Sequence, residues 1–140
     1  MKPQNKFSHL VRVQYRDVDS AGHVNNAVYL HYLEDTRMHF LARLYGDYSI
    51  ADIDFVLVGL TINYHSRAEY GETLVVDIEI TNIGRTSWSF DFLIKEKETG
   101  RKIASGSSTQ VMFDYSKGEK MPIPDKLRAK LKSILGDGVE

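Results

Sequence analysis

The chain has 140 residues, 42% of them hydrophobic, which indicates one globular domain over residues 1–140 with a self-sufficient core. Eighteen basic residues are balanced by nineteen acidic ones, so no excess positive charge is available for a nucleic-acid partner. The absence of cysteine excludes disulfides, thiolate zinc sites and cysteine nucleophiles.

At the start of the chain, Lys2 and Lys6 are not followed by the apolar core of a signal peptide. The longest uninterrupted apolar stretch, residues 55–60 with their glycine, is far too short to span a bilayer. We therefore expect a cytoplasmic protein with no membrane partner.

The first predicted elements are a strand, a turn and a long helix. Val11, Val13 and Tyr15 alternate with polar residues, which predicts a strand with one buried face. Residues 17–22 are rich in Asp, Ser and Gly and predict a turn. No glycine or proline occurs from residue 26 to 45, and Gly46 follows as a C-cap, so a helix is expected there. Because most of its positions are apolar, we expect other structure to cover most of its circumference.

Four extended runs with a period of two follow the helix, at residues 56–64, 74–80, 88–94 and 103–113. The segments 82–85 and 98–101 have hairpin length, so the last three runs should form an antiparallel meander. Trp88 and its alternating neighbours are expected in the core. Pro122 and Pro124 end the sheet, and Asp125 can cap a short amphipathic helix. The prediction is an α+β fold with a long helix wrapped by a five-stranded antiparallel sheet.

The densest group of chemically capable residues is the segment 15–26, Y-R-D-V-D-S-A-G-H-V-N-N, directly before the long helix. Unpaired N–H groups and the positive dipole end at a helix N-terminus can polarise a carbonyl oxygen. Together with a carboxylate and an imidazole, they suit hydrolysis of an activated acyl group. The competing interpretation is structural, with the acids as turn formers and Asn25 or Asn26 as helix cap. On residue chemistry alone, the structural interpretation is the more common one.

One motif in this segment is specific enough to indicate a family. It is the string D-x-D-x-x-G-H-V-N-N at residues 17–26, followed by Tyr-Leu pairs at 29–30 and 32–33. Weaker matches lie at 63–64, 71–72, 111–114 and 122–124. The sequence resembles the 4-hydroxybenzoyl-CoA thioesterase-like family of hotdog proteins, particularly its bacterial acyl-CoA thioesterases. The resemblance implies the hotdog fold and hydrolysis of an acyl-CoA to free acid and CoA.

The resemblance also implies roles for individual residues. Asp19 would act as general base on a water or as the nucleophile. Backbone N–H groups near Asn26 would polarise the carbonyl, and His23 would orient the water or the carboxylate. The substrate-binding residues expected from it are Tyr15, Gly22, Asn25, Tyr29, Val58, Gly59 and Arg67.

Two positions depart from related patterns. Plant acyl-carrier-protein thioesterases carry an Asn two residues after the catalytic Asp, where this chain has Ala21, so a carboxylate mechanism is favoured over a papain-like one. Arg67 replaces a proline that is common in the family, and it could contact a CoA phosphate or remain an ordinary surface arginine. Gly59, inside a strand, could admit the pantetheine arm or mark an ordinary bulge.

Three further expectations concern partners, metals and alternative activities. A sheet with open edges favours a homodimer, and the resemblance implies active sites at the subunit interface and assembly into tetramers in some members.

His31, Asp35 and His39 recur on one helix face at a spacing that could chelate a metal, but without a ligand from a second helix or a metal-binding signature we expect a solvated stripe and no metal. No organic cofactor is implied. The alternatives are an acyl-thioester dehydratase or hydratase, and a non-catalytic acyl-CoA-binding protein.

Overall fold

The computed structural model describes residues 1, 5–46 and 54–135. The expectation that the N-terminus carries no signal peptide falls partly on residues 2–4, which lie outside the described residues. The strands are β1 (Lys6–Arg12), β2 (Phe55–Tyr64), β3 (Thr73–Ile83), β4 (Ser87–Glu96), β5 (Lys102–Asp114) and β6 (Glu119–Lys120). The helices are α1 (Val28–Tyr45) and α2 (Asp125–Leu135), and a 3-10 turn, η2, spans Tyr15–Asp17. These elements confirm the expected α+β architecture with one long helix and a short C-terminal helix.

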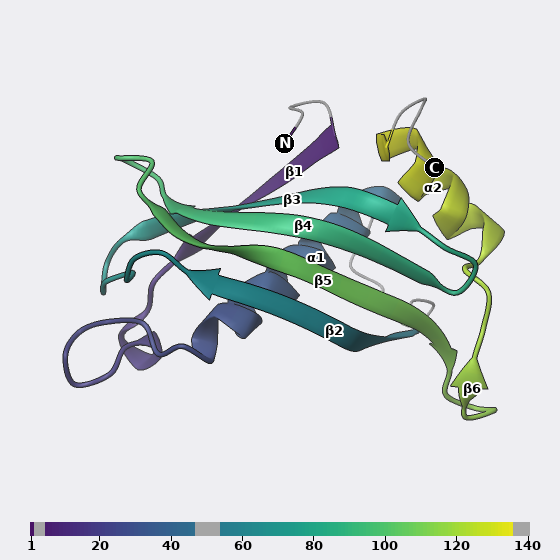
Figure 1. Cartoon of the computed structure of the whole chain (residues 1–140), viewed down its shortest axis with the longest axis horizontal. Helices are drawn as coiled ribbons and strands as arrows, with labels where there is room; N and C mark the ends of the chain where they lie inside the picture. Colours follow the sequence, from purple (N-terminus) through teal and green to yellow (C-terminus); the bar gives the residue numbers. More distant parts are fainter. Residues whose placement is uncertain (2–4, 47–53, 136–140) are drawn as a thin grey trace.

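The strands form one sheet in the order β1-β3-β4-β5-β2, with the short β6 paired to β5. Each pair is antiparallel, and β3, β4 and β5 are consecutive neighbours, as the meander prediction requires. Figure 1 shows α1 lying across one face of this sheet and α2 beside its end. Neither helix in the described ranges combines the length and apolarity needed to cross a membrane.

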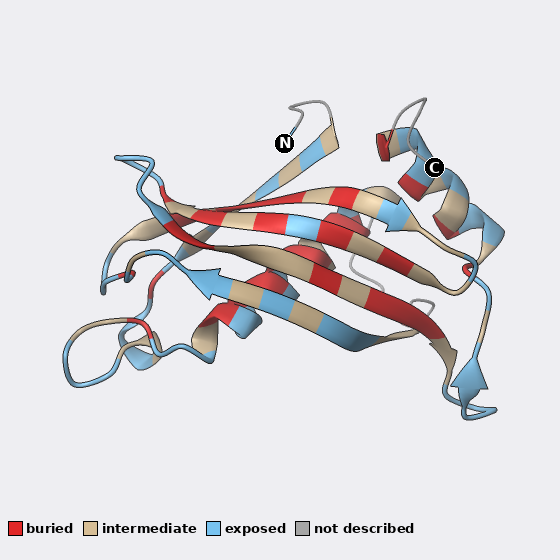
Figure 2. Cartoon of the chain, in the orientation of Figure 1, coloured by how far each residue is buried: buried red, intermediate tan, exposed pale blue. Residues whose placement is uncertain are grey.

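The core lies between α1 and the inner face of the sheet. Alternate side chains of β3 and β4 are buried, as their period of two predicts, and Figure 2 shows the resulting stripes. Trp88 and Phe90 are both 0% exposed, which confirms them as core residues. In α2 the three leucines at positions 127, 131 and 135 are buried at helical spacing.

The long helix follows its prediction at the C-terminal end, where Gly46 has a φ of +82° and caps α1. Its sheet-facing side is buried, including Tyr29, Leu33 and Phe40. The opposite side is more open than expected, since Leu30 is 43% exposed and Asp35 is exposed. Within one chain, α1 is therefore covered on one side only.

Two strand predictions need correction. The first strand ends at Arg12, because Gln14 and Asp17 form a reciprocal capping box that winds Tyr15 into η2. In β2, the register with β5 shifts between Leu57 and Gly59. This bulge interrupts the expected alternation and leaves Val58 56% exposed on the edge strand.

Candidate active site

The loop that precedes α1 is tied to the segment that follows β2. Isolated bridges pair Val18 with Val24 and His23 with Glu69, and the Val24 N–H donates to the Ala68 carbonyl over 2.9 Å. Gly22 has a φ of +80°, a conformation that glycine adopts without strain. The motif 17–26 and the segment 64–70 therefore form one continuous surface.

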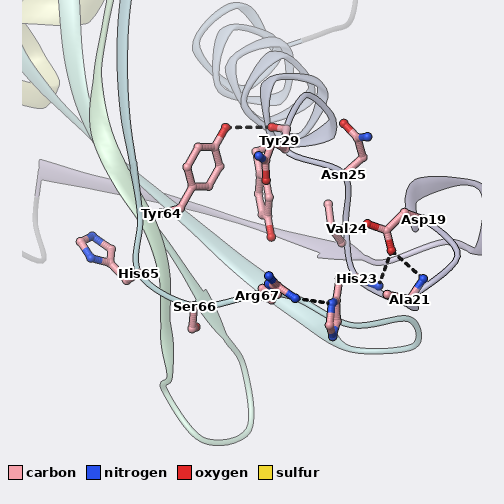
Figure 3. Close-up of a pocket in the computed structure, with 11 residues that line it drawn as sticks. Asp19, Ala21, His23, Val24, Asn25, Tyr29, Tyr64, His65, Ser66 and Arg67 are labelled. Atoms are coloured by element: carbon pink, nitrogen blue, oxygen red, sulfur yellow. Dashed lines mark hydrogen bonds between the residues drawn. The ribbon is translucent and has the colours of Figure 1, made fainter.

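Asp19 is exposed and is held through one carboxylate oxygen. Its Oδ1 accepts hydrogen bonds from the N–H of Ala21 at 2.9 Å and of His23 at 3.3 Å. In the part of the chain that the structure describes, no hydrogen bond engages Oδ2, and Figure 3 shows this oxygen on the side of the carboxylate that faces Tyr29. The carboxylate is thus oriented by the backbone while one oxygen stays available for chemistry.

The side chain of His23 is bound by Arg67 rather than by the carboxylate of Asp19. The Arg67 guanidinium lies 3.0 Å from His23 Nδ1, and His23 Nε2 lies 4.0 Å from Glu69 Oε1. Since a guanidinium only donates, Nδ1 is the acceptor and the imidazole proton of the neutral ring is on Nε2. His23 therefore contacts Asp19 through its backbone, whose N–H donates to Asp19 Oδ1 and whose carbonyl oxygen accepts from the Asp19 N–H.

At the start of α1, three polar groups shape the turn. Asn25 Oδ1 accepts from the Ala27 N–H at 2.9 Å, and the Asn25 carbonyl accepts from the Val28 N–H at 2.9 Å. The Tyr64 hydroxyl donates to the Asn26 carbonyl oxygen over 2.9 Å. Among the hydrogen bonds of the described residues, none uses the Asn26 N–H as donor. A backbone donor is thus available at the helix start.

Tyr29 forms the floor of the site, with only 2% of its surface exposed. Its hydroxyl accepts from the Ala68 N–H at 3.2 Å, and its ring lies 5.5 Å from that of Tyr64. Burial raises the pKa of the Tyr29 hydroxyl, against a smaller lowering by the bond from Ala68. The phenol is therefore neutral at physiological pH.

These groups line a cavity of about 600 Å³ (Figure 3). It brings together six of the residues predicted from the sequence: Asp19, His23, Asn25, Asn26, Tyr29 and Arg67. A volume of this size is within the range of small-molecule sites. The arrangement offers a carboxylate, a backbone donor, an aromatic wall and a cation at one cavity.

Four predicted substrate-binding residues do not line this cavity. Tyr15 is 79% exposed and packs edge-on against Tyr70, and with Gly22 it borders a separate hollow. Val58 and Gly59 lie on the open edge of β2. A Cβ at Gly59 would meet nothing within 4 Å, so no described part of this chain approaches the glycine closely.

The structure adds residues that motif reasoning missed, chiefly His65 and Ser66, which line the cavity between Tyr64 and Arg67. His65 Nε2 lies 2.7 Å from Ser105 Oγ, and the Ser66 hydroxyl donates to the Lys102 carbonyl at 2.7 Å. The sequence signal that could have identified His65 and Ser66 is their position in the chain between Tyr64 and Arg67. Tyr64, which lies in one of the weaker matches to the family, also lines the cavity.

A family model described as the thioesterase-like superfamily matches residues 13–131. The chain belongs to this superfamily. The long-chain acyl-CoA thioesterase FadM of Escherichia coli is 26% identical over 127 residues, covering 89% of this chain and 96% of that protein. A putative esterase of Synechocystis sp. is 31% identical over 120 residues, covering 82% of this chain and 71% of that protein.

Solved structures of thioesterases share the fold. A thioesterase from Thermus thermophilus, solved in complex with coenzyme A and Zn, superimposes with a TM-score of 0.81 at 27% identity. The match covers 94% of this chain and 96% of the Thermus protein. The hotdog architecture and the family that the motif 17–26 indicated are confirmed.

Proposed function

We propose that this chain, an acyl-CoA thioesterase, hydrolyses its substrate in the cavity at the start of α1, with Asp19 as the reactive carboxylate. The named relatives, FadM among them, support the reaction class, and the coenzyme A complex of the Thermus protein supports an acyl-CoA substrate. The proposed location is the cytoplasm, because CoA thioesters are intracellular metabolites.

The observation that carries the proposal is the anchoring of Asp19. Two backbone N–H groups hold Oδ1 and leave Oδ2 for a water molecule or for the carbonyl carbon. As general base, Asp19 removes a proton from the attacking water; as nucleophile, it forms an acyl anhydride that water then hydrolyses. Both routes place negative charge on the former carbonyl oxygen.

The Asn26 N–H is the proposed donor to that oxygen. It lies at the positive end of α1, where a developing oxyanion is stabilised by the helix dipole as well as by the hydrogen bond. The bond from the Tyr64 hydroxyl to the Asn26 carbonyl fixes the adjoining peptide group. The leaving group is a thiolate, which departs without a strong general acid.

The other predicted residues take binding and positioning roles in this proposal. His23 orients Asp19 by its backbone N–H, while Arg67 offers its remaining guanidinium donors to a CoA phosphate. Asn25 holds the helix start, and Tyr29 closes the acyl side of the cavity.

We also propose a homodimer that pairs the β2 edges, with a dimer of dimers as a further assembly. One side of β2 has no strand neighbour among the described residues, and Leu57 and Val58 are 46% and 56% exposed there. A free apolar edge is the surface that strand pairing across a two-fold axis covers. Tyr64 ends this strand, so a partner would also adjoin the active site.

The test is Asp19→Asn in an acyl-CoA hydrolysis assay that follows thiol release. We expect kcat to fall by about 10²-fold or more, because the amide can neither accept the proton nor attack. Asp91→Asn, an exposed acid on β4, is the matched control and should leave kcat unchanged. Circular dichroism and light scattering verify the fold and assembly of each variant. Turnover at the wild-type rate in a folded Asp19→Asn protein would overturn the assignment.

A further inference from the structure

A second cluster of ligand-type side chains lies away from the active-site cavity, on the exposed side of α1. Asp35 and His39 are one turn apart on α1, and β1 brings His9 against them. His9 pairs with Val76 of β3, so its backbone is fixed in the sheet. His31, a member of the helix-face stripe, is outside the cluster and is exposed.

The three side chains already converge. His9 Nε2 lies 2.9 Å from Asp35 Oδ2, His39 Nδ1 lies 3.4 Å from Asp35 Oδ1, and one ligand atom of each residue lies within 4.8 Å of the others. Donor atoms around one tetrahedral ion with bonds of about 2.0–2.1 Å are about 3.3 Å apart. His39 Nδ1 also lies 2.8 Å from the Asp35 backbone carbonyl oxygen, so ligation through this nitrogen would replace that hydrogen bond as side-chain rotations bring the three donors onto one ion.

We propose that His9, Asp35 and His39 form a binding site for a divalent transition-metal ion of the zinc class. Two imidazole nitrogens and one carboxylate oxygen are donors that Zn²⁺ accepts and that Mg²⁺ and Ca²⁺ do not prefer. Asp35 supplies one negative charge against the two positive charges of the ion. Water completes the coordination sphere, because the side chains are 18% (His9), 54% (Asp35) and 34% (His39) exposed.

The surroundings set the strength of the site. The two imidazole rings are stacked with centroids 4.0 Å apart, and a hollow of about 400 Å³ opens beside them. Arg43 also borders this hollow, one turn beyond His39, and its positive charge opposes the ion. With one carboxylate and an open position, we expect micromolar affinity.

The site is separate from the proposed active site. It shares no lining residue with the cavity of Asp19, and Asp35 is six residues beyond Tyr29, about 9 Å along the helix axis. A bound ion would link the edge strand β1 to α1. Because the folded chain alone brings His9 to α1, zinc should raise the thermal midpoint of unfolding.

The experiment is calorimetric titration of the full chain, freed of metal by a chelator, with zinc chloride. We expect one ion per chain, with affinity at least about tenfold weaker in His9→Gln and in Asp35→Asn. His31→Gln is the matched control on the same helix and should bind zinc as the wild type does. Zinc should raise the unfolding midpoint of the wild type and of His31→Gln, but not of His9→Gln.

Three results would overturn the proposal. The first is no zinc binding by the wild-type chain at concentrations up to about 100 µM. The second is unchanged affinity in a folded His9→Gln or Asp35→Asn variant. The third is loss of binding in His23→Gln or His65→Gln instead, which would assign the ion to the active-site cavity.

Discussion

Asp17 and Asp19 are two residues apart and have opposite surroundings. Asp17 Oδ2 accepts from the Tyr32 hydroxyl and from the Gln14 N–H, both at 2.9 Å, which makes Asp17 a structural acid. Asp19 uses only Oδ1 for the backbone of its own turn. The hydrogen bonds thus distinguish the two carboxylates of one motif: those of Asp17 hold other elements in place, and those of Asp19 leave one oxygen for the proposed reaction.

Tyr32 should make stability depend on alkaline pH. Burial, followed by the hydrogen bond to Asp17, raises the pKa of Tyr32 in the folded chain, whereas an unfolded tyrosine titrates near pH 10. Its contribution is complete below about pH 10 and is lost as pH rises further, because only the unfolded chain then releases the proton.

The measurement is urea unfolding of wild type and Tyr32→Phe between about pH 8 and 11. The loss of unfolding free energy with rising pH should be smaller in Tyr32→Phe. Part of the loss should persist, since burial raises the pKa of Tyr29 as well. Tyr15→Phe removes a phenol that is 79% exposed and should leave the alkaline slope unchanged. An identical slope in Tyr32→Phe would refute this account.

Arg67 can be tested with two substrates. In Arg67→Gln, KM for an acyl-CoA should rise about tenfold, the size of one charge-assisted contact to phosphate. KM for the matching acyl-pantetheine, which has no phosphate, should stay within about twofold, and Arg67→Lys should keep most of the binding. Equal effects on both substrates would instead assign Arg67 to the positioning of His23, which it contacts at 3.0 Å.

The sequence predicted which residues line the cavity better than it predicted which of their side chains contact one another. Asp19, His23 and Asn26 lie within eight residues of the chain, so one motif identifies them. The contacts of Arg67 with His23 and of Tyr64 with Asn26 span 44 and 38 residues. No local pattern encodes which distant side chain the fold brings to a given atom.

Among the elements, the pairing of β2 with β5 depends on Gly106. A Cβ at Gly106 would lie 1.9 Å from the Thr61 carbonyl oxygen and 2.9 Å from the Phe92 ring. We expect Gly106→Ala to lower the free energy of unfolding by more than about 3 kcal/mol, measured by urea unfolding. Gly59→Ala is the matched control, since its Cβ meets nothing, and should change stability by less than about 1 kcal/mol. Similar stability of the two variants would contradict the close packing.

The elements themselves were largely predictable, because apolar periodicity and Gly46 are local signals. The errors occur where a short-range hydrogen bond overrides the period. The Gln14–Asp17 capping box ends the first strand early, and the bulge before Gly59 turns Val58 outward. Apolar periodicity predicts which side chains share a face of a strand, but it does not predict where a capping box or a bulge interrupts the strand.

For the whole molecule, the exposed edge of β2 predicts its assembly. Val58→Lys should convert the proposed dimer to monomer in light scattering, because it places charge on the pairing edge. Leu10→Lys, on the opposite edge strand β1 and 54% exposed, should leave the assembly unchanged. A monomeric wild-type chain, or a dimer that persists in Val58→Lys, would refute pairing through β2.

The backbone ties of the loop before α1 have an entropic consequence. The N–H groups of Asp19, Gly22 and Val24 donate to His23, Asp19 and Ala68, so this segment is ordered as part of folding. Its conformational freedom is lost when the chain folds and not when a substrate arrives. Binding free energy is then not spent on ordering the Asp19 carboxylate, which is oriented before a substrate arrives.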